Sequence, residues 1–260
     1  MSSHPAVSAA GIHGLIDDVT RSALRLFDSV AALTDGELRS PSGLEGWTRG
    51  HVLAHVSRSA DAYVWLLRLA RTGAEPGPRP DAAALARAVE ETAGLSAARL
   101  VTEVRRSLEQ FLDQARAMPV PAWDGLVTAL AGWRHPAWYT LHRCLREVET
   151  HHLDLGLGHG TADWPASYVL WALDDTLATL SGRGFALASV EAVDLGRSWN
   201  ISADGPVVSA PGHVLLGWLS GRTRADESTS PFPGVSVPCP PPWPQPPTPG
   251  WGRCGGGGGG

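Results

Sequence analysis

A short segment near the middle of the chain carries several side chains that can bind a metal ion. It reads Leu-Arg-Glu-Val-Glu-Thr-His-His-Leu-Asp-Leu-Gly over residues 145–156. Glu147 and His151 stand four residues apart, so in a helix both side chains lie on one face, one turn apart. A carboxylate oxygen and an imidazole nitrogen placed in this way can meet a single ion. Such a mixed set of ligands suits zinc first.

A third ligand must come from another part of the chain, because a catalytic zinc site usually has three protein ligands and one open position. His55, in the segment Gly-Trp-Thr-Arg-Gly-His-Val-Leu-Ala-His over 46–55, is the best candidate. Three polar side chains at the edge of a helical core would cost free energy that a bound metal could offset. The sequence therefore predicts a mononuclear zinc site made of His55, Glu147 and His151.

Other interpretations of these residues stay open at this point. A single histidine beside an apolar stripe is often a hydrogen-bonded core residue, and a Glu-x-x-x-His pair also occurs as a solvent-facing pair. Glu149 and His152, three residues apart, could replace Glu147 and His151, as in di-iron bundles that use Glu-x-x-His. Those bundles need further carboxylates, however, and none stands beside His55 in its own helix. A mononuclear site fits better.

The composition excludes several classes of function. Hydrophobic residues make up 43% of the 260 residues and charged residues 18%, as in an ordinary globular protein. A net charge of -5 does not favour nucleic acid or anionic lipid. The chain shows no signal peptide and no apolar run long enough for a membrane span, so we expect a cytoplasmic monomer without nucleic-acid or membrane partners.

The cysteines also indicate a reducing compartment. Cys144, Cys239 and Cys254 are too few and too scattered for a disulfide framework. Cys144 lies one helical turn before Glu147 and could be a further metal ligand. A small buried hydrophobic residue is the better interpretation of Cys144.

Four amphipathic helices are expected before residue 160. Apolar residues recur at intervals of three and four over 12–33, 49–72, 82–118 and 137–155. Thr48 offers an N-cap for the second helix, Gly94 could break the third, and Gly156 ends the fourth. The segment between the third and fourth helices is expected to be a loop. Long helices with short links indicate an antiparallel four-helix bundle, a scaffold that often holds metals on facing helices.

The pattern changes after Gly160. Helices over 164–180 and 210–220, with short strands within 185–194, 199–202 and 206–209, predict a small α+β domain. Proline and glycine dominate after Ser228, and such a sequence cannot bury enough apolar surface to order itself. The predicted fold class is therefore α+β overall. Its parts are a disordered N-terminus (1–10), a four-helix metal-binding bundle (11–160), a small α+β domain (161–228) and a disordered tail (229–260).

Three segments together are characteristic of one protein family. The segments 46–55 and 146–156, followed by Trp-Leu-Ser-Gly-Arg over 218–222, resemble the mycothiol-dependent maleylpyruvate isomerases. These enzymes belong to the wider group of DinB-like four-helix metal proteins. The resemblance extends over about residues 11–225, in the same order and with the same division into two domains.

The resemblance implies a zinc- and mycothiol-dependent enzyme that converts maleylpyruvate to fumarylpyruvate in gentisate degradation. Its zinc ligands would be His55, Glu147 and His151, and its essential arginine in the second domain would be Arg222. The thiolate of mycothiol would add to the cis double bond, and its expulsion after rotation would give the trans product. Arg222 could bind a carboxylate or an enolate oxygen. It could equally compensate the dipole at the end of a helix, following Gly221.

Two other functions fit the same residues. A mycothiol S-transferase would use the same thiolate to attack an electrophilic xenobiotic or antibiotic and would leave the thiol attached. Only the walls of its pocket would differ from those of an isomerase. A non-catalytic protein that binds a metal or a ligand would keep the bundle but would need neither a thiol site nor Arg222.

Overall fold

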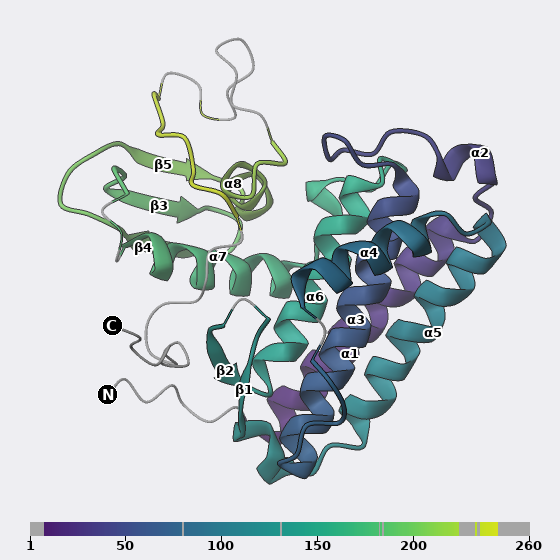
Figure 1. The fold of residues 1–260 in the computed structure, drawn as a ribbon. Helices are drawn as coiled ribbons and strands as arrows, with labels where there is room; N and C mark the ends of the chain where they lie inside the picture. Colours follow the sequence, from purple (N-terminus) through teal and green to yellow (C-terminus); the bar gives the residue numbers. More distant parts are fainter. Residues whose placement is uncertain are drawn as a thin grey trace, which may run out of the picture. The chain divides into compact units, whose positions relative to one another are not determined.

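The chain forms two compact units, one within residues 1–158 and the other within 159–250. The computed structural model describes residues 8–79, 81–130, 132–181, 183, 185–223, 232 and 235–243. The first unit is mainly helical, and the second combines helices with a small sheet, so the predicted α+β class is confirmed (Figure 1). The finer domain boundaries and the disordered ends stay predictions, and Cys254 lies outside the described residues.

A four-helix bundle forms the core of the first unit. Its helices are α1 (Ala9–Val30), α3 (Arg49–Thr72), α5 (Ala97–Arg116) and α6 (Tyr139–Asp154). Each packs against two others, in the order α1, α5, α3, α6 and back to α1. Each helix has a fully buried leucine, and removal of this apolar surface from water stabilises the bundle. These leucines are Leu26, Leu53, Leu108 and Leu145.

The segment 82–118 is divided at Gly94, where the sequence analysis allowed a break. It forms α4 (Ala82–Ala93) and α5, with a reversal of the chain at Gly94, a residue that weakens a helix. Ser57 of α3 contacts Ser107, and Tyr63 contacts Phe111, so α5 runs parallel to α3. The reversal lets α5 complete the bundle while α4 covers the outer side of α3.

A short helix before α3 was not predicted. The link between the first two predicted helices contains α2 (Asp35–Leu38), which begins with a capping box between Thr34 and Glu37. Asp35 accepts a hydrogen bond from the backbone N–H of Ala97 (2.6 Å), in the first turn of α5. The first N–H groups of a helix have no partner within it, so α2 satisfies one of them from outside.

The expected loop between α5 and α6 contains a hairpin. Its elements are the 3-10 helix η1 (Val120–Asp124) and the antiparallel strands β1 (Leu126–Thr128) and β2 (Arg134–Pro136). His135 of β2 is completely buried, and its Nδ1 lies 2.8 Å from the carbonyl oxygen of Pro136. Its Nε2 lies 3.3 Å from Nη1 of Arg143. Because an arginine can only donate, Nε2 accepts and the ring is neutral.

The second unit is a small sheet with two helices. It contains η2 (Thr161–Asp163), α7 (Ala166–Ser181), β3 (Ser189–Ala192), β4 (Arg197–Asn200), β5 (Val207–Ala210) and α8 (Gly212–Leu219). The strand order is β4-β3-β5, in which β3 pairs antiparallel with β4 and parallel with β5. In the part of the chain that is described, no helix is long and apolar enough to cross a membrane.

Burial of His135 predicts an acid-sensitive fold. Burial and the nearby charge of Arg143 lower the pKa of His135 to about 3. In the unfolded chain the pKa is about 6.5, so below that pH the unfolded state binds a proton that the folded state does not. As the pH decreases from about 6.5 to 3, His135 should therefore lower the free energy of unfolding by up to about 1.4 kcal/mol per pH unit.

We expect His135→Gln to reduce this loss of stability, as measured by urea unfolding at pH 7.5, 6 and 5. The same replacement at the exposed His13 is the control, since that side chain reaches solvent in both states. An equal dependence on pH in the wild type and in His135→Gln would contradict the prediction.

Candidate metal centre

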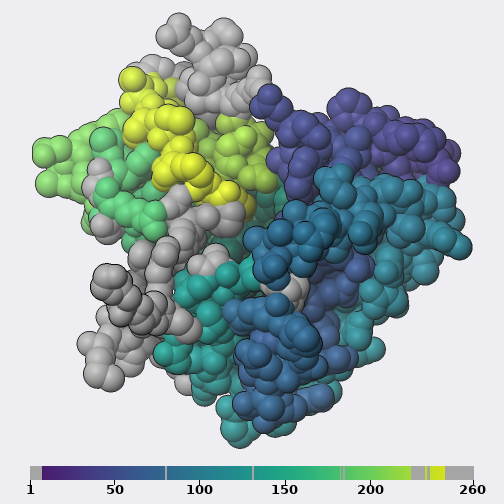
Figure 2. Space-filling view, viewed as in Figure 1, coloured from purple at the N-terminus to yellow at the C-terminus, as the bar shows by residue number. Residues whose placement is uncertain are grey.

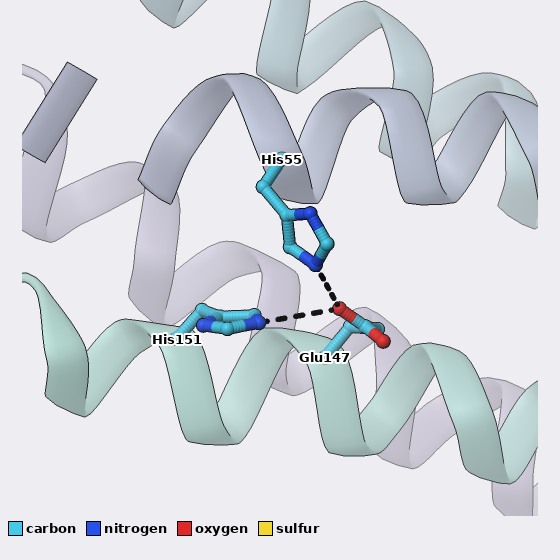
Figure 3. A group of neighbouring side chains, drawn as sticks. All are labelled: His55, Glu147 and His151. Atoms are coloured by element: carbon cyan, nitrogen blue, oxygen red, sulfur yellow. Dashed lines mark hydrogen bonds and ion pairs between the residues drawn. The ribbon is translucent and has the colours of Figure 1, made fainter. Parts of the chain in front are cut away.

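The three predicted zinc ligands meet where α3 passes α6. His55 lies in the second turn of α3, and Glu147 and His151 lie one turn apart on α6; Figure 3 shows the three side chains pointing toward one another. Nε2 of His55 is 3.2 Å and Nε2 of His151 is 3.4 Å from Oε2 of Glu147. Two ligand atoms at about 2.0–2.1 Å from a tetrahedral zinc ion lie about 3.3 Å apart, so these separations fit one ion.

The beginning of α3 is fastened to the end of α6. Arg49 donates hydrogen bonds to the carbonyl oxygens of Leu155 (2.8 Å) and Gly156 (3.2 Å). The backbone N–H of Gly43 donates to the carbonyl oxygen of Asp154 (2.7 Å). The last carbonyl groups of a helix have no partner within it, so these bonds satisfy them from outside. They also set which turn of α3 faces which turn of α6.

Asp154 holds the ring of His151. Nδ1 of His151 lies 2.9 Å from Oδ2 of Asp154, whose side chain is buried. A hydrogen bond from Nδ1–H to a carboxylate leaves Nε2 free to bind a metal, and such support is usual behind metal-binding histidines. The sequence analysis did not include Asp154. Its signal was the spacing of three residues after His151, which places both side chains on one helical face.

Tyr63 supports the carboxylate of Glu147 from the other side. Its hydroxyl group donates to Oε1 of Glu147 (3.1 Å), while Oε2 faces the two histidines. Burial and the negative charge of Glu147 raise the pKa of Tyr63, so the hydroxyl keeps its proton and remains a donor. The sequence analysis gave Tyr63 no role at this site.

The cluster carries compensated charges. Burial alone would raise the pKa of Glu147, but hydrogen bonds and positive charge from His151 and His55 hold it well below its usual value. Burial lowers the pKa of His151, yet Asp154 and Glu147 outweigh burial and raise it to about 9. A metal that binds Nε2 of His151 must therefore displace a proton.

The alternative pair, Glu149 and His152, faces α1. Glu149 accepts hydrogen bonds from Ser22 and Arg25. Nε2 of His152 lies 2.8 Å from Oγ of Ser29. The structure therefore does not bring these two residues to His55.

The cluster contains neither of the other two candidate residues, Cys144 and Arg222. Cys144 is buried, and burial raises the pKa of its thiol well above the usual value, so the thiol stays protonated. Arg222 belongs to the second unit and follows Gly221, whose φ of 72° ends α8. Arg222 donates to the carbonyl oxygen of Ser220 (2.7 Å), and its guanidinium lies 5.6 Å from the ring centre of Trp243. The bond to Ser220 satisfies a carbonyl group at the end of α8, and a catalytic role of Arg222 stays a prediction.

Comparison with known proteins identifies the family. Residues 19–156 match the family described as the mycothiol maleylpyruvate isomerase N-terminal domain. This chain belongs to that family. All three residues of the cluster lie within the matched segment.

Solved structures share the fold of this family member. The crystal structures of the mycothiol-dependent maleylpyruvate isomerase and of a histidine-to-alanine mutant of it each have a TM-score of 0.78 and 23% sequence identity. Each similarity covers 89% of this chain and 97% of that chain. No curated protein matches the chain.

Metal content tests which residues of α6 bind the metal. We expect His55→Ala, Glu147→Ala and His151→Ala to purify with much less than one zinc per chain, because two ligands do not hold the ion. His152→Ala should keep one zinc per chain, because His152 faces α1. Metal analysis by mass spectrometry measures both. Loss of zinc from His152→Ala alone would refute the assignment.

Asp154 gives a second test of the site. Asp154→Ala removes the acceptor that orients His151, and zinc affinity should fall by about 10- to 100-fold. Asp154→Asn keeps an acceptor oxygen without the charge, so its affinity should lie between those of Asp154→Ala and the wild type. Competition with a chromogenic chelator measures these affinities, with circular dichroism as a control for folding. Equal affinities in all three proteins would show that Asp154 has no part in the site.

Proposed function

We propose that this protein is a zinc- and mycothiol-dependent isomerase that converts maleylpyruvate to fumarylpyruvate. The observation that supports it is the cluster of His55, Glu147 and His151, within a segment that matches a family named for this isomerase. Three protein ligands leave a fourth position of a zinc ion for a cosubstrate. The side chains of His55 and Glu147 are 33% and 22% exposed, which gives a thiol access.

The proposed chemistry needs no net change in atoms or electrons. Zinc, when bound, would supply the thiol of mycothiol as a thiolate at neutral pH. The sulfur adds to one carbon of the cis double bond, and the electron pair of that bond moves to the neighbouring carbonyl group as an enolate. Rotation about the new single bond, return of the electron pair and cleavage of the carbon–sulfur bond give the trans product and release the thiol.

The residues of this chain would orient the groups that take part. Asp154 and Tyr63 fix His151 and Glu147, so that Nε2 and Oε2 face the ion. We assign to Arg222 the binding of a substrate carboxylate or of the enolate oxygen, because its planar donors match two oxygens at once. A cytoplasmic location and a monomeric state stay predictions.

A second candidate is a mycothiol S-transferase, in which the sulfur stays bonded to an electrophile. One observation favours it. Tyr63, whose hydroxyl group contacts Glu147, also lines a largely apolar pocket. Such walls suit an electrophile with an apolar body better than a small polar acid.

An absorbance assay with maleylpyruvate tests the proposal. Turnover to fumarylpyruvate should require both mycothiol and zinc, and it should disappear after treatment with a chelator and return when zinc is added. Protein that contains zinc but gives no turnover would refute the isomerase. A panel of electrophiles, with mass spectrometry of mycothiol adducts, would then test the transferase.

Arg222 provides the control within this assay. We expect Arg222→Ala to lower kcat/KM by about 100- to 1,000-fold, since it removes an electrostatic contact to the developing charge. Arg222→Lys should recover part of this loss because it keeps the charge without the planar fork. Zinc content should be unchanged in both variants. Unaltered turnover in Arg222→Ala would exclude the catalytic role of Arg222.

A further inference from the structure

The first unit contains a pocket on the outer side of α3. Its volume is about 280 Å³, close to the lower end of the range of small-molecule sites. The lining residues come from α3, α4, β1, α6 and the segments next to them, and we call it the α3–α4 pocket. Figure 2 shows the surface of α4, in blue, and that of the β1–β2 hairpin, in teal, on one face of this unit.

The walls of the α3–α4 pocket are mainly apolar. Trp65 and Tyr63 contribute aromatic rings from α3. The remaining apolar wall consists of Ala62, Leu66, Leu85, Ala88 and Leu130. An apolar body in the pocket would lose contact with water where it touches these walls, which favours binding.

Two arginines lie against these rings. The guanidinium carbon of Arg79 is 4.8 Å from the ring centre of Trp65, and that of Arg143 is 4.8 Å from the ring centre of Tyr63. Both arginines line the pocket. Stacking on an aromatic face restricts the guanidinium groups, so little freedom is lost when a ligand binds them.

Neither stacked arginine has a carboxylate partner within the described part of the chain. Arg79 donates to the carbonyl oxygen of Thr128 (2.6 Å), and Arg143 donates to a ring nitrogen of His135. In contrast, Arg58, which also lines the pocket, is paired with Asp61 (3.2 Å). Three arginines and one aspartate give the lining a formal charge of +2. Positive charge against apolar walls favours an anionic ligand.

One wall of the α3–α4 pocket lies next to the metal centre. Tyr63 lines it with its ring and contacts Glu147 with its hydroxyl group. Arg143 precedes Glu147 by one turn of α6, and Arg58 follows His55 by nearly one turn of α3. The two sites are therefore adjacent, although they share no ligand residue.

We propose that the α3–α4 pocket binds an organic acid with an apolar body, such as an aryl carboxylate. Its carboxylate faces Arg79 and Arg143, and its body lies against the leucines. If the second candidate function holds, that of a mycothiol S-transferase, on which this second part rests, the pocket receives the electrophile and determines its class.

Calorimetric titration of the zinc-loaded full chain with 2-naphthoate tests the pocket. We expect saturable binding of one ligand per chain. Leu85→Asp and Leu85→Asn form a matched pair, because both shorten the same half-buried side chain and only one adds a charge. Leu85→Asp should bind 2-naphthoate about tenfold more weakly than Leu85→Asn. The uncharged 2-naphthamide should not distinguish the two variants.

Two further outcomes separate this site from the metal centre. Binding of 2-naphthoate should persist after the metal is removed with a chelator, since none of the lining residues is a proposed zinc ligand. No saturable binding, equal affinities of Leu85→Asp and Leu85→Asn, or a need for zinc would each overturn the pocket proposal.

The role of the pocket in turnover is measured separately. With an active enzyme, 2-naphthoate should raise the KM of the electrophile and leave kcat unchanged; an unchanged KM would refute the electrophile's placement. Binding of 2-naphthoate without any turnover would leave the pocket intact and refute the proposed function. Turnover without binding of 2-naphthoate would support the proposed function and refute the pocket proposal.

Discussion

The half-buried carboxylate of Glu147 is the constraint on which the metal centre depends. A charged group that is partly removed from water is stable only when opposite charge and hydrogen-bond donors lie next to it. His151 comes from the same helix, but His55 and Tyr63 come from α3, so compensation of this one charge requires α3 and α6 to meet at a fixed register. The same arrangement places an oxygen and two nitrogens where a zinc ion can bind all three. Compensation of the charge of Glu147 thus fixes the packing of α3 against α6 and also brings the three ligand atoms together.

The segments that link the bundle helices determine which side chains lie next to the metal centre. Arg49 and Gly43 bind the last carbonyl groups of α6 and bring the first two turns of α3 to His151. The reversal at Gly94 places α4 outside the bundle, against α3. The β1–β2 hairpin closes on α3 from another side. The α3–α4 pocket results from these irregular elements, whereas the zinc ligands lie on regular helices. Rigid helices hold the ligands, and the variable connections form the walls next to them.

Family membership and pocket chemistry answer different questions. The match over 19–156 identifies the helical unit and the segment that carries the ligands. A bound thiolate can attack many electrophiles, so the ligand set does not choose among them. That choice depends on the side chains beside the candidate metal centre. Here these are aromatic rings, leucines and two arginines that have no carboxylate partner among the described residues.

The sequence by itself determined the bundle helices and the pair of Glu147 and His151, because both depend on local spacing. Apolar residues at intervals of three and four predict α3 at its observed bounds, and a spacing of four places Glu147 and His151 on one face. Only the tertiary structure decided that Glu147 and His151, rather than Glu149 and His152, face His55, because adjacent faces of one helix differ by the neighbour they meet. It also decided the reversal at Gly94, the hairpin before α6, and the support from Tyr63. These features depend on contacts between residues far apart in the chain, or on which side of a helix is covered, and no periodic pattern in the sequence records them.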